Sequence, residues 1–146
     1  MLLCTDGSQL ATHALAAGLR VLAPAARTVV VTVIEPPDVS LVTGDSGFGA
    51  GVMSPVEYDH EVTAHHLAAE QVLRDTVSAL GLDGAETRTL EGDPGHALCE
   101  AAAELPATVI VTGSHGRGGI KRALLGSVSD HLVRHAHCPV LVTRPE

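Results

Sequence analysis

Glycines and a helix start are spaced along residues 113–130 in a way that suits a phosphate group. The stretch reads GSHGRGGIKRALLGSVSD. Gly113 and Gly116 allow a tight turn and a close approach of the backbone to a ligand. Gly126 and Ser127 begin a predicted helix, whose first turn offers free N–H groups and the positive end of the helix dipole. The spacing predicts a pocket for a di- or triphosphate between Gly113 and Gly126. The alternative is a flexible loop before an ordinary capped helix.

The same loop is an island of positive charge in an acidic chain. The sequence has 9 Lys and Arg against 17 Asp and Glu, for a net charge of −8. Arg117, Lys121 and Arg122 lie in the loop, and no acidic residue lies between Gly113 and Val128. An acidic chain repels a nucleic-acid backbone, and two aromatic residues are too few to stack bases. The pattern favours a small polyanion, unless the cations serve only solubility.

A carboxylate, Asp6, follows the first apolar run, in the segment Thr5-Asp6-Gly7-Ser8. On its own it would repel a phosphate. It suits a bridging Mg²⁺, a hard cation that prefers carboxylate and phosphate oxygens. Asp6 is therefore a candidate metal contact through a Mg-nucleotide. The alternatives are that it caps a helix or accepts a ribose hydroxyl.

Histidines and cysteines give weaker signals. His131 and His135 are four residues apart on one predicted helix, and His137 and Cys138 follow closely. That spacing suits Zn²⁺, but no second pair of ligands completes a site, so we expect no zinc centre. The three cysteines form no CxxC pair, which indicates reduced thiols in a cytosolic protein.

Apolar runs and helical patterns alternate along the chain. The predicted strands are 2–5, 28–34, 85–90, 108–112 and 139–143, and the predicted helices follow Ser8, Ser54 and Asp93 and occupy 127–136. This order predicts an α/β fold: a doubly wound, five-stranded parallel sheet with strand order 3-2-1-4-5 and helices on both faces, Rossmann-like. Ligands bind such sheets at the carboxyl ends of strands one and four, where the winding reverses. Asp6 and Gly113 stand at those two ends.

Apolar spacing and capping residues define the helices. The second helix opens with a capping box from Ser54 to Glu57 and ends at Gly81. Before it, residues 38–53 carry four glycines and no clear period, and we expect a flexible loop there. The predicted inward faces are Leu10, Ala14, Ala17 and Val21 in the first helix, and Val62, His66, Ala69, Leu73, Val77 and Leu80 in the second.

Length and composition limit the function classes. A chain of 146 residues with 45% hydrophobic residues suits a single domain over residues 1–146. The start MLLCTDGS has no basic n-region, and the longest strongly apolar stretch is too short to cross a bilayer, so we expect a cytoplasmic protein without a membrane partner. No GxxxxGK[ST], GxGxxG or GxSxG motif is present, and we expect no machinery for rapid ATP turnover.

Gly113-x2-Gly116-x9-Gly126-Ser127 resembles the nucleotide-binding signature of the universal stress protein family, in its ATP-binding branch. The resemblance extends over nearly the whole chain. It includes the opening TDGS, the strand VTVIEP, the segment EGDPGHAL and the closing RHAHCPVLVTRP.

The resemblance implies a five-stranded α/β domain that dimerises and holds ATP, with Mg²⁺, across the carboxyl ends of strands one and four. The last strand, Val140–Thr143, resembles the family's dimer edge, and exposed edge strands favour pairing. By position, the resemblance places Thr5 and Asp6 at the nucleoside and the Mg²⁺, Val33 at the adenine, Gly113, His115 and Gly116 at the ribose and phosphates, and Gly126, Ser127, Val128 and Ser129 at the phosphates.

The function that this resemblance implies is that of an ATP-binding, nucleotide-responsive regulator in the stress response. One alternative is a nucleotide-independent protein of the same fold that works through dimerisation and partner contact. Another is an enzyme, either a slow ATPase or an adenylyl-type transferase. Only Asp6, His115 or a metal-bound water could supply its attacking group. No catalytic residue is assigned.

Overall fold

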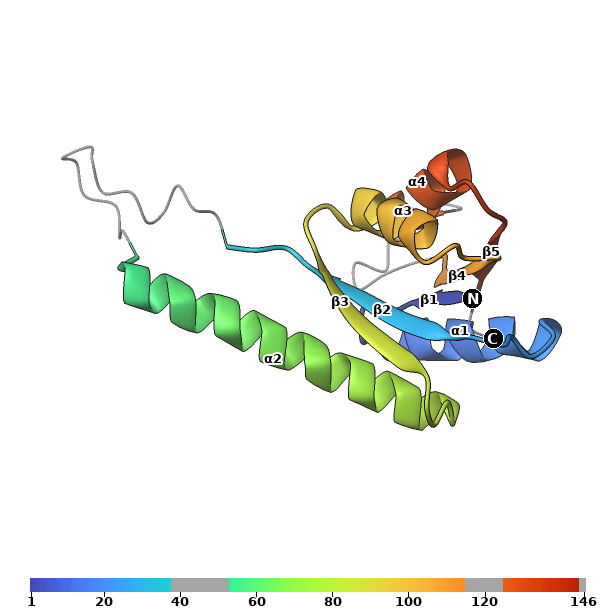
Figure 1. Ribbon diagram of the computed structural model, residues 1–146, viewed down its shortest axis with the longest axis horizontal. Helices are drawn as coiled ribbons and strands as arrows, with labels where there is room; N and C mark the ends of the chain where they lie inside the picture. Colours follow the sequence, from blue (N-terminus) through green and yellow to red (C-terminus); the bar gives the residue numbers. More distant parts are fainter. Residues whose placement is uncertain (38–52, 115–124, 145–146) are drawn as a thin grey trace.

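The computed structural model of the 146-residue chain describes residues 1–37, 53–114 and 125–144 (Figure 1). Its strands form one parallel five-stranded sheet in the order β3-β2-β1-β4-β5, which confirms the predicted topology. The strands are β1 (Leu2–Cys4), β2 (Val29–Ile34), β3 (Glu86–Glu91), β4 (Ile110–Gly113) and β5 (Val140–Thr143). The helices are α1 (Gln9–Val21), α2 (Pro55–Leu80), α3 (Pro94–Glu104) and α4 (Ser127–His135).

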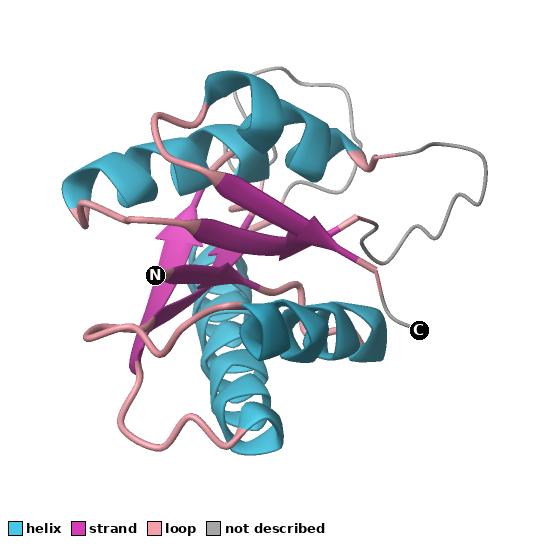
Figure 2. Ribbon diagram, turned by 90° about the vertical axis from the view of Figure 1, so that its right-hand side faces the viewer, coloured by secondary structure: helices cyan, strands magenta, loops and turns pink. Residues whose placement is uncertain are grey.

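Helices cover both faces of the sheet, and each face has its own aliphatic core (Figure 2). Successive residues of a strand point to opposite faces. Leu2 and Cys4 of β1 therefore pack beneath α3 and α4, while Leu3 packs against α1 and α2. The inner strands read as continuous apolar runs because both of their faces are buried.

The buried face of α1 shares only Ala14 with the predicted one. Ala11, Ala14, Leu15 and Gly18 are buried, whereas Leu10 is 45% and Val21 71% exposed. The helix is apolar on most of its circumference, so spacing alone does not define one inward face. The close approach of α1 to the sheet defines it, because a Cβ on Gly18 would lie 2.6 Å from Cγ1 of Val111 in β4. The side with the smallest residues packs on the sheet.

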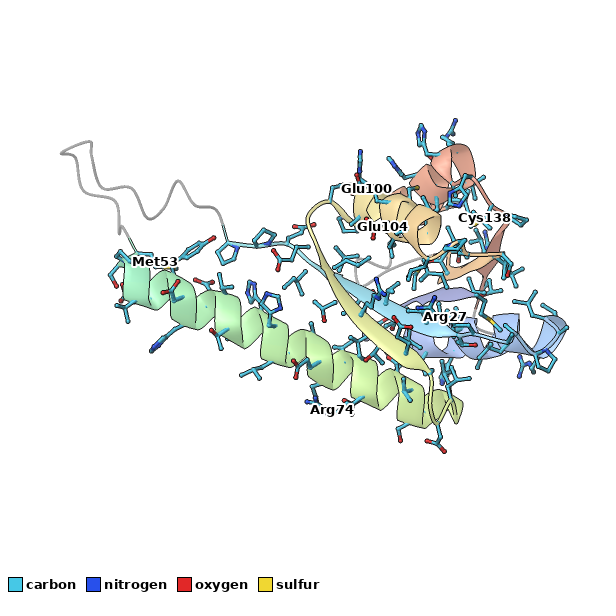
Figure 3. The ribbon with its side chains drawn as sticks, in the orientation of Figure 1. Arg27, Met53, Arg74, Glu100, Glu104 and Cys138 are labelled. Carbon is cyan, nitrogen blue, oxygen red and sulfur yellow. The ribbon has the colours of Figure 1, made fainter. Side chains whose placement is uncertain are left out.

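The predicted start and end of α2 are confirmed. Ser54 N donates to Glu57 Oε2 at 2.8 Å and Glu57 N donates to Ser54 Oγ at 3.2 Å, which forms the capping box. Gly81 ends the helix in the left-handed conformation, with φ +61°. The first half of α2 extends beyond the sheet, with Met53 at its tip (Figures 1 and 3). Of the predicted 38–53 loop, residues 38–52 lie outside the described part.

The described helices include none that combines the length and the apolar character needed to cross a membrane.

Candidate functional site

The carboxyl ends of β1 and β4 lie side by side at the predicted switch point. Leu2 pairs with Ile110 and Leu3 with Val111. From β1 the chain continues to β2 and β3 on one side of β1, and it then crosses to β4 and β5 on the other side. The winding therefore reverses between β1 and β4. Two segments lie at this edge: residues 5–8 after β1, and the end of β4 at Gly113 with Ser114 directly after it.

The segment after β1 is a tight turn closed by its own side chains. Gly7 N donates to Thr5 Oγ1 at 3.1 Å, and Ser8 N donates to Asp6 Oδ1 at 2.9 Å. Ser8 is the N-cap of α1 and accepts from Ala11 N at 3.1 Å. Ser8 therefore caps the helix, as predicted, while Asp6 shapes the turn before it.

Helix α2 packs against this turn. Thr5 is buried, and its Oγ1 lies 3.4 Å from Oγ1 of Thr76, which donates to Val72 O at 2.8 Å. Gly7 has φ +79°, and a Cβ there would lie 2.7 Å from Cγ2 of Val72. The Thr5 side chain thus faces α2. Sequence reasoning missed Val72 and Thr76, because their partners lie far away along the chain.

Ser114 joins the end of β4 to the start of α4. It is 2% exposed; its N–H donates to Thr143 O at 2.9 Å, and its carbonyl accepts from Gly126 N at 2.7 Å. Ser129 Oγ donates to Gly126 O at 3.0 Å and to Ser114 O at 3.5 Å. These bonds bring Gly126 to the end of β4. Sequence reasoning missed Ser114, whose one signal is its place directly after a buried strand.

The amino end of α4 presents backbone donors without a side-chain cap. Gly126 is its N-cap and makes no side-chain capping bond. The first N–H groups of a helix have no carbonyl in a preceding turn. The first turn's acid, Asp130, binds Arg134 at 2.8 Å, and this guanidinium lowers the pKa of the Asp130 carboxyl. Ser127 is exposed, whereas the Ser129 hydroxyl is taken up in the contacts with Ser114 and Gly126.

Backbone conformation explains Gly7 at this edge but does not explain Gly113 or Gly126. Gly126 has φ −73°, and the described positive-φ glycines do not include Gly113. Both conformations accept any L-residue. What glycine provides here is backbone without a side chain, beside the first N–H groups of α4, and such a cradle fits an anion.

On the β2 side of this edge, an apolar contact is followed by an ion pair. Val33 is half-buried next to Leu90. One residue further along β3, Glu91 Oε1 pairs with His66 Nε2 of α2 at 3.1 Å. The remaining predicted contacts, His115 and Gly116, lie outside the described residues, as do the loop cations Arg117, Lys121 and Arg122.

The other candidate ligands do not gather into a metal centre. In residues 1–37, 53–114 and 125–144, no group of three or more His, Cys, Asp or Glu side chains could hold a metal ion. His131 and His135 stack on α4 with ring centroids 4.5 Å apart. The three cysteines are free thiols, and burial raises the pKa of each.

Known proteins share both the sequence pattern and the fold. The chain is 45% identical to Universal stress protein MJ0531 of Methanocaldococcus jannaschii over 58 residues, which are 40% of this chain and 34% of that protein. It spans about a third of the length of the curated relatives it matches. A solved universal stress family protein from Burkholderia pseudomallei is 33% identical, with a TM-score of 0.65, over 99% of this chain and 94% of that one.

A universal stress protein solved in complex with cAMP has the same fold, with a TM-score of 0.64 and 24% identity over 99% of this chain and 95% of that one. The model of the Universal stress protein family matches residues 1–144. That match covers nearly every element described above, and this chain belongs to the universal stress protein family.

Proposed function

We propose that this chain binds ATP, together with Mg²⁺, at the carboxyl ends of β1 and β4 and acts as a nucleotide-responsive regulator in the stress response. One observation carries the proposal: the uncapped start of α4 is held against the end of β4 by the 2.7 Å bond from Gly126 N to Ser114 O. A helix start of this kind attracts phosphate. Family membership and the cAMP complex of a protein with this fold support a nucleotide as the ligand.

We assign each predicted contact a role in this site. The backbone N–H groups of Ser127, Val128 and Ser129 donate to phosphate oxygens, with Gly113 and Gly126 leaving room for them. Asp6 binds the Mg²⁺, whose charge offsets the repulsion between the carboxylate and the phosphates. Val33 contacts the adenine through apolar surface. His115 and Gly116 complete the ribose and phosphate contacts.

The same proposal includes a homodimer through residues 140–143 and a cytoplasmic location. The open edge of the sheet at β5 supports the former. The free thiols support the latter.

Replacing Gly126 with Asp separates ligand binding from folding. Asp and Ser are both better N-caps than Gly, and a carboxylate favours the helix dipole. The Gly126→Asp variant should therefore unfold at the same temperature as the wild type or slightly above it. Its carboxylate would occupy the phosphate position, and we expect the affinity for Mg-ATP, measured by calorimetry, to fall at least about tenfold.

Two controls sharpen this test. Gly126→Ser adds a neutral cap of similar size, and it should weaken Mg-ATP binding less than Asp does. Adenosine has no phosphate, so its weak binding should be the same in the wild type and in Gly126→Asp. Equal Mg-ATP affinities in the wild type and Gly126→Asp would refute the phosphate assignment. A purified wild type that carries no nucleotide, as judged by its absorbance at about 260 nm, and that also fails to bind added Mg-ATP would refute the function.

A further inference from the structure

A cavity lies at the opposite end of the sheet from the candidate site. It has a volume of about 360 Å³ and opens where β1 and β2 begin, between the segment that leads into β2 and the segment that leads from α3 to β4. The buried Leu2 and Val29 line it, and Leu105 and Ala107, just after α3, are half-buried beside them. Because all five strands are parallel, this cavity is separated from the candidate site by the length of the strands.

Backbone hydrogen bonds hold the walls of this cavity. The N–H groups of Leu105 and Ala107 donate to carbonyls in the last turn of α3, at 3.0 Å and 2.9 Å, which fixes the segment after the helix. On the other side, Val29 N donates to Met1 O at 3.0 Å. Walls that are fixed in this way need little ordering when a ligand binds, which favours binding.

The lining of the cavity is apolar except for two residues. Eight of its ten lining residues are apolar, and the other two are Arg27 and Thr108. Water finds few hydrogen-bonding partners against such walls, so an apolar group that displaces it is stabilised. Sites for small molecules combine apolar walls with a few polar groups that fix the orientation of the ligand, in volumes of about 300–1,000 Å³.

Arg27 supplies the charged group of the cavity. It lies at the start of β2 (Figure 3), and its carbonyl accepts from the Met1 amino group at 2.6 Å. Side chains two residues apart along a strand point to the same face of a sheet, so Arg27 lies on the face of the buried Val29. Its Nη2 lies 2.6 Å from the carboxylate of Glu86, and Nε of Arg88 lies 2.9 Å from the same carboxylate.

This cluster keeps one positive charge, because two guanidinium groups share one carboxylate. Hydrogen bonds from Arg27 and Arg88 lower the pKa of Glu86, which therefore stays ionised. The Arg27 side chain is 55% exposed, and a guanidinium has more N–H donors than one carboxylate takes up. At the opposite wall, α3 ends beside Leu105 with the negative end of its dipole. An anion is therefore favoured at Arg27 and disfavoured at the α3 wall.

We propose that this cavity binds an aliphatic carboxylate, such as a medium-chain fatty acid, with its carboxylate at Arg27 and its alkyl chain along Leu2, Val29 and Leu105. The carboxylate accepts charge-assisted hydrogen bonds from the guanidinium. The alkyl chain replaces water along the apolar walls. A nucleotide suits this cavity poorly, because its lining residues include no glycine and no helix start to hold the phosphates.

Titration of the wild type with three small molecules tests the two parts of this ligand. Octanoate and octanol have the same alkyl chain and differ in charge, whereas acetate has the charge without the chain. NMR spectra of the protein, with Met1 as its first residue, follow the binding. We expect octanoate to shift the amide signals of Leu2, Val29 and Leu105 and to bind at least about fivefold more tightly than octanol. Acetate should leave these signals unchanged.

An arginine variant tests the carboxylate contact. Arg27→Gln removes the charge, and it should weaken octanoate binding at least about fivefold while octanol binding stays the same. Arg74→Gln is the matched control, because Arg74 is an exposed arginine on α2 that pairs with Glu70, and it should change neither affinity. Exposed ion pairs contribute little to stability, so both variants should unfold at the temperature of the wild type.

A filled cavity tests the alkyl contact. Ala25 lines the cavity and is half-buried, and Ala25→Leu should weaken the binding of octanoate and octanol alike, at least about tenfold. The matched control is Ala103→Leu on the exposed side of α3, which should weaken neither. Thermal unfolding shows that both variants are folded.

The outcomes separate this site from the proposed nucleotide site. Gly126→Asp should bind octanoate as the wild type does, so the loss of Mg-ATP binding leaves this inference standing. Equal affinities of the wild type for octanoate and octanol, or unchanged octanoate binding in Arg27→Gln, would overturn the carboxylate assignment. Octanoate binding that is unchanged in Ala25→Leu, or that shifts no amide signal around the cavity, would overturn the site itself.

Discussion

The thiol of Cys4 lies between the sheet and α3, in the same aliphatic cluster as Val31 and Leu98. Burial raises the pKa of Cys4 strongly, and the nearby Cys99 and Cys138 raise it further. In the unfolded chain, this thiol returns to an ordinary pKa of about 8.5. The unfolded state therefore loses the proton first as pH rises. The contribution of Cys4 to stability is complete below that value and declines above it.

This linkage predicts a pH dependence that one substitution removes. Between about pH 9 and pH 11, the free energy of unfolding of the wild type should fall more steeply than that of Cys4→Ala, by up to about 1.4 kcal/mol per pH unit. Urea titrations with reductant present measure both slopes. Cys138→Ala is the matched control, because Cys138 is only half-buried and should change the slope less. Parallel curves for the wild type and Cys4→Ala would show that the thiol titrates alike in both states.

Among the elements, α1 depends most on close approach. Gly18→Ala adds a methyl group that meets Cγ1 of Val111, a fully buried side chain. In an exposed helix this change would stabilise by about 1 kcal/mol. Here we expect a net loss of about 1–3 kcal/mol in the free energy of unfolding. Val111→Ala removes the opposing methyl, so the double variant should lose less than the sum of the single losses. Simple additivity would mean that α1 shifts without strain.

The sequence predicted the elements whose causes are local. Ser8, Ser54 and Asp93 cap helices as expected, since each cap bonds within three residues of itself. The strand order was predicted from a difference in composition: the inner strands are apolar, whereas the edge strand is charged. The inward face of α1 was predicted wrongly, because the pattern LATHALAAGLRV offers more than one apolar stripe. Which stripe is buried depends on how α1 fits against β4, and the local sequence of α1 does not determine that fit.

The candidate site also has features that the sequence predicts and features that depend on the folded chain. Its position at the ends of β1 and β4 followed from topology, and the helix start at Gly126 from residue types. The contacts that shape it did not. Thr5 meets Thr76 across 71 residues, and Ser114 meets Thr143 across the last crossover. Such partners are known only once the chain is folded. The resemblance places Ser129 at the phosphates, and in the structure its hydroxyl donates to the backbone.

At the scale of the whole molecule, Ser114 connects the proposed phosphate site with the β5 edge of the proposed homodimer. Its carbonyl accepts from Gly126 N at the start of α4, and its N–H donates to Thr143 O of β5. Thr143 in turn donates through Oγ1 to Ala14 O of α1. The start of α4, the open edge strand and the helix that flanks it therefore share one hydrogen-bonded junction. A ligand that orders this junction from one side reduces the entropy lost when the other side is ordered.

Nucleotide binding should accordingly strengthen the homodimer. We expect saturating Mg-ATP to lower the dimer dissociation constant of the wild type about fivefold or more, and the dimer to bind Mg-ATP tighter than the monomer by the same factor, because binding linkage is reciprocal. Sedimentation equilibrium with and without Mg-ATP measures the first effect, and calorimetry across a range of protein concentrations measures the second. Gly126→Asp, which keeps Ser114 and β5 intact, should show the nucleotide-free dissociation constant at every Mg-ATP concentration. An unchanged constant in the wild type at saturating Mg-ATP would show that the junction at Ser114 holds the fold together without carrying a signal between the two sites.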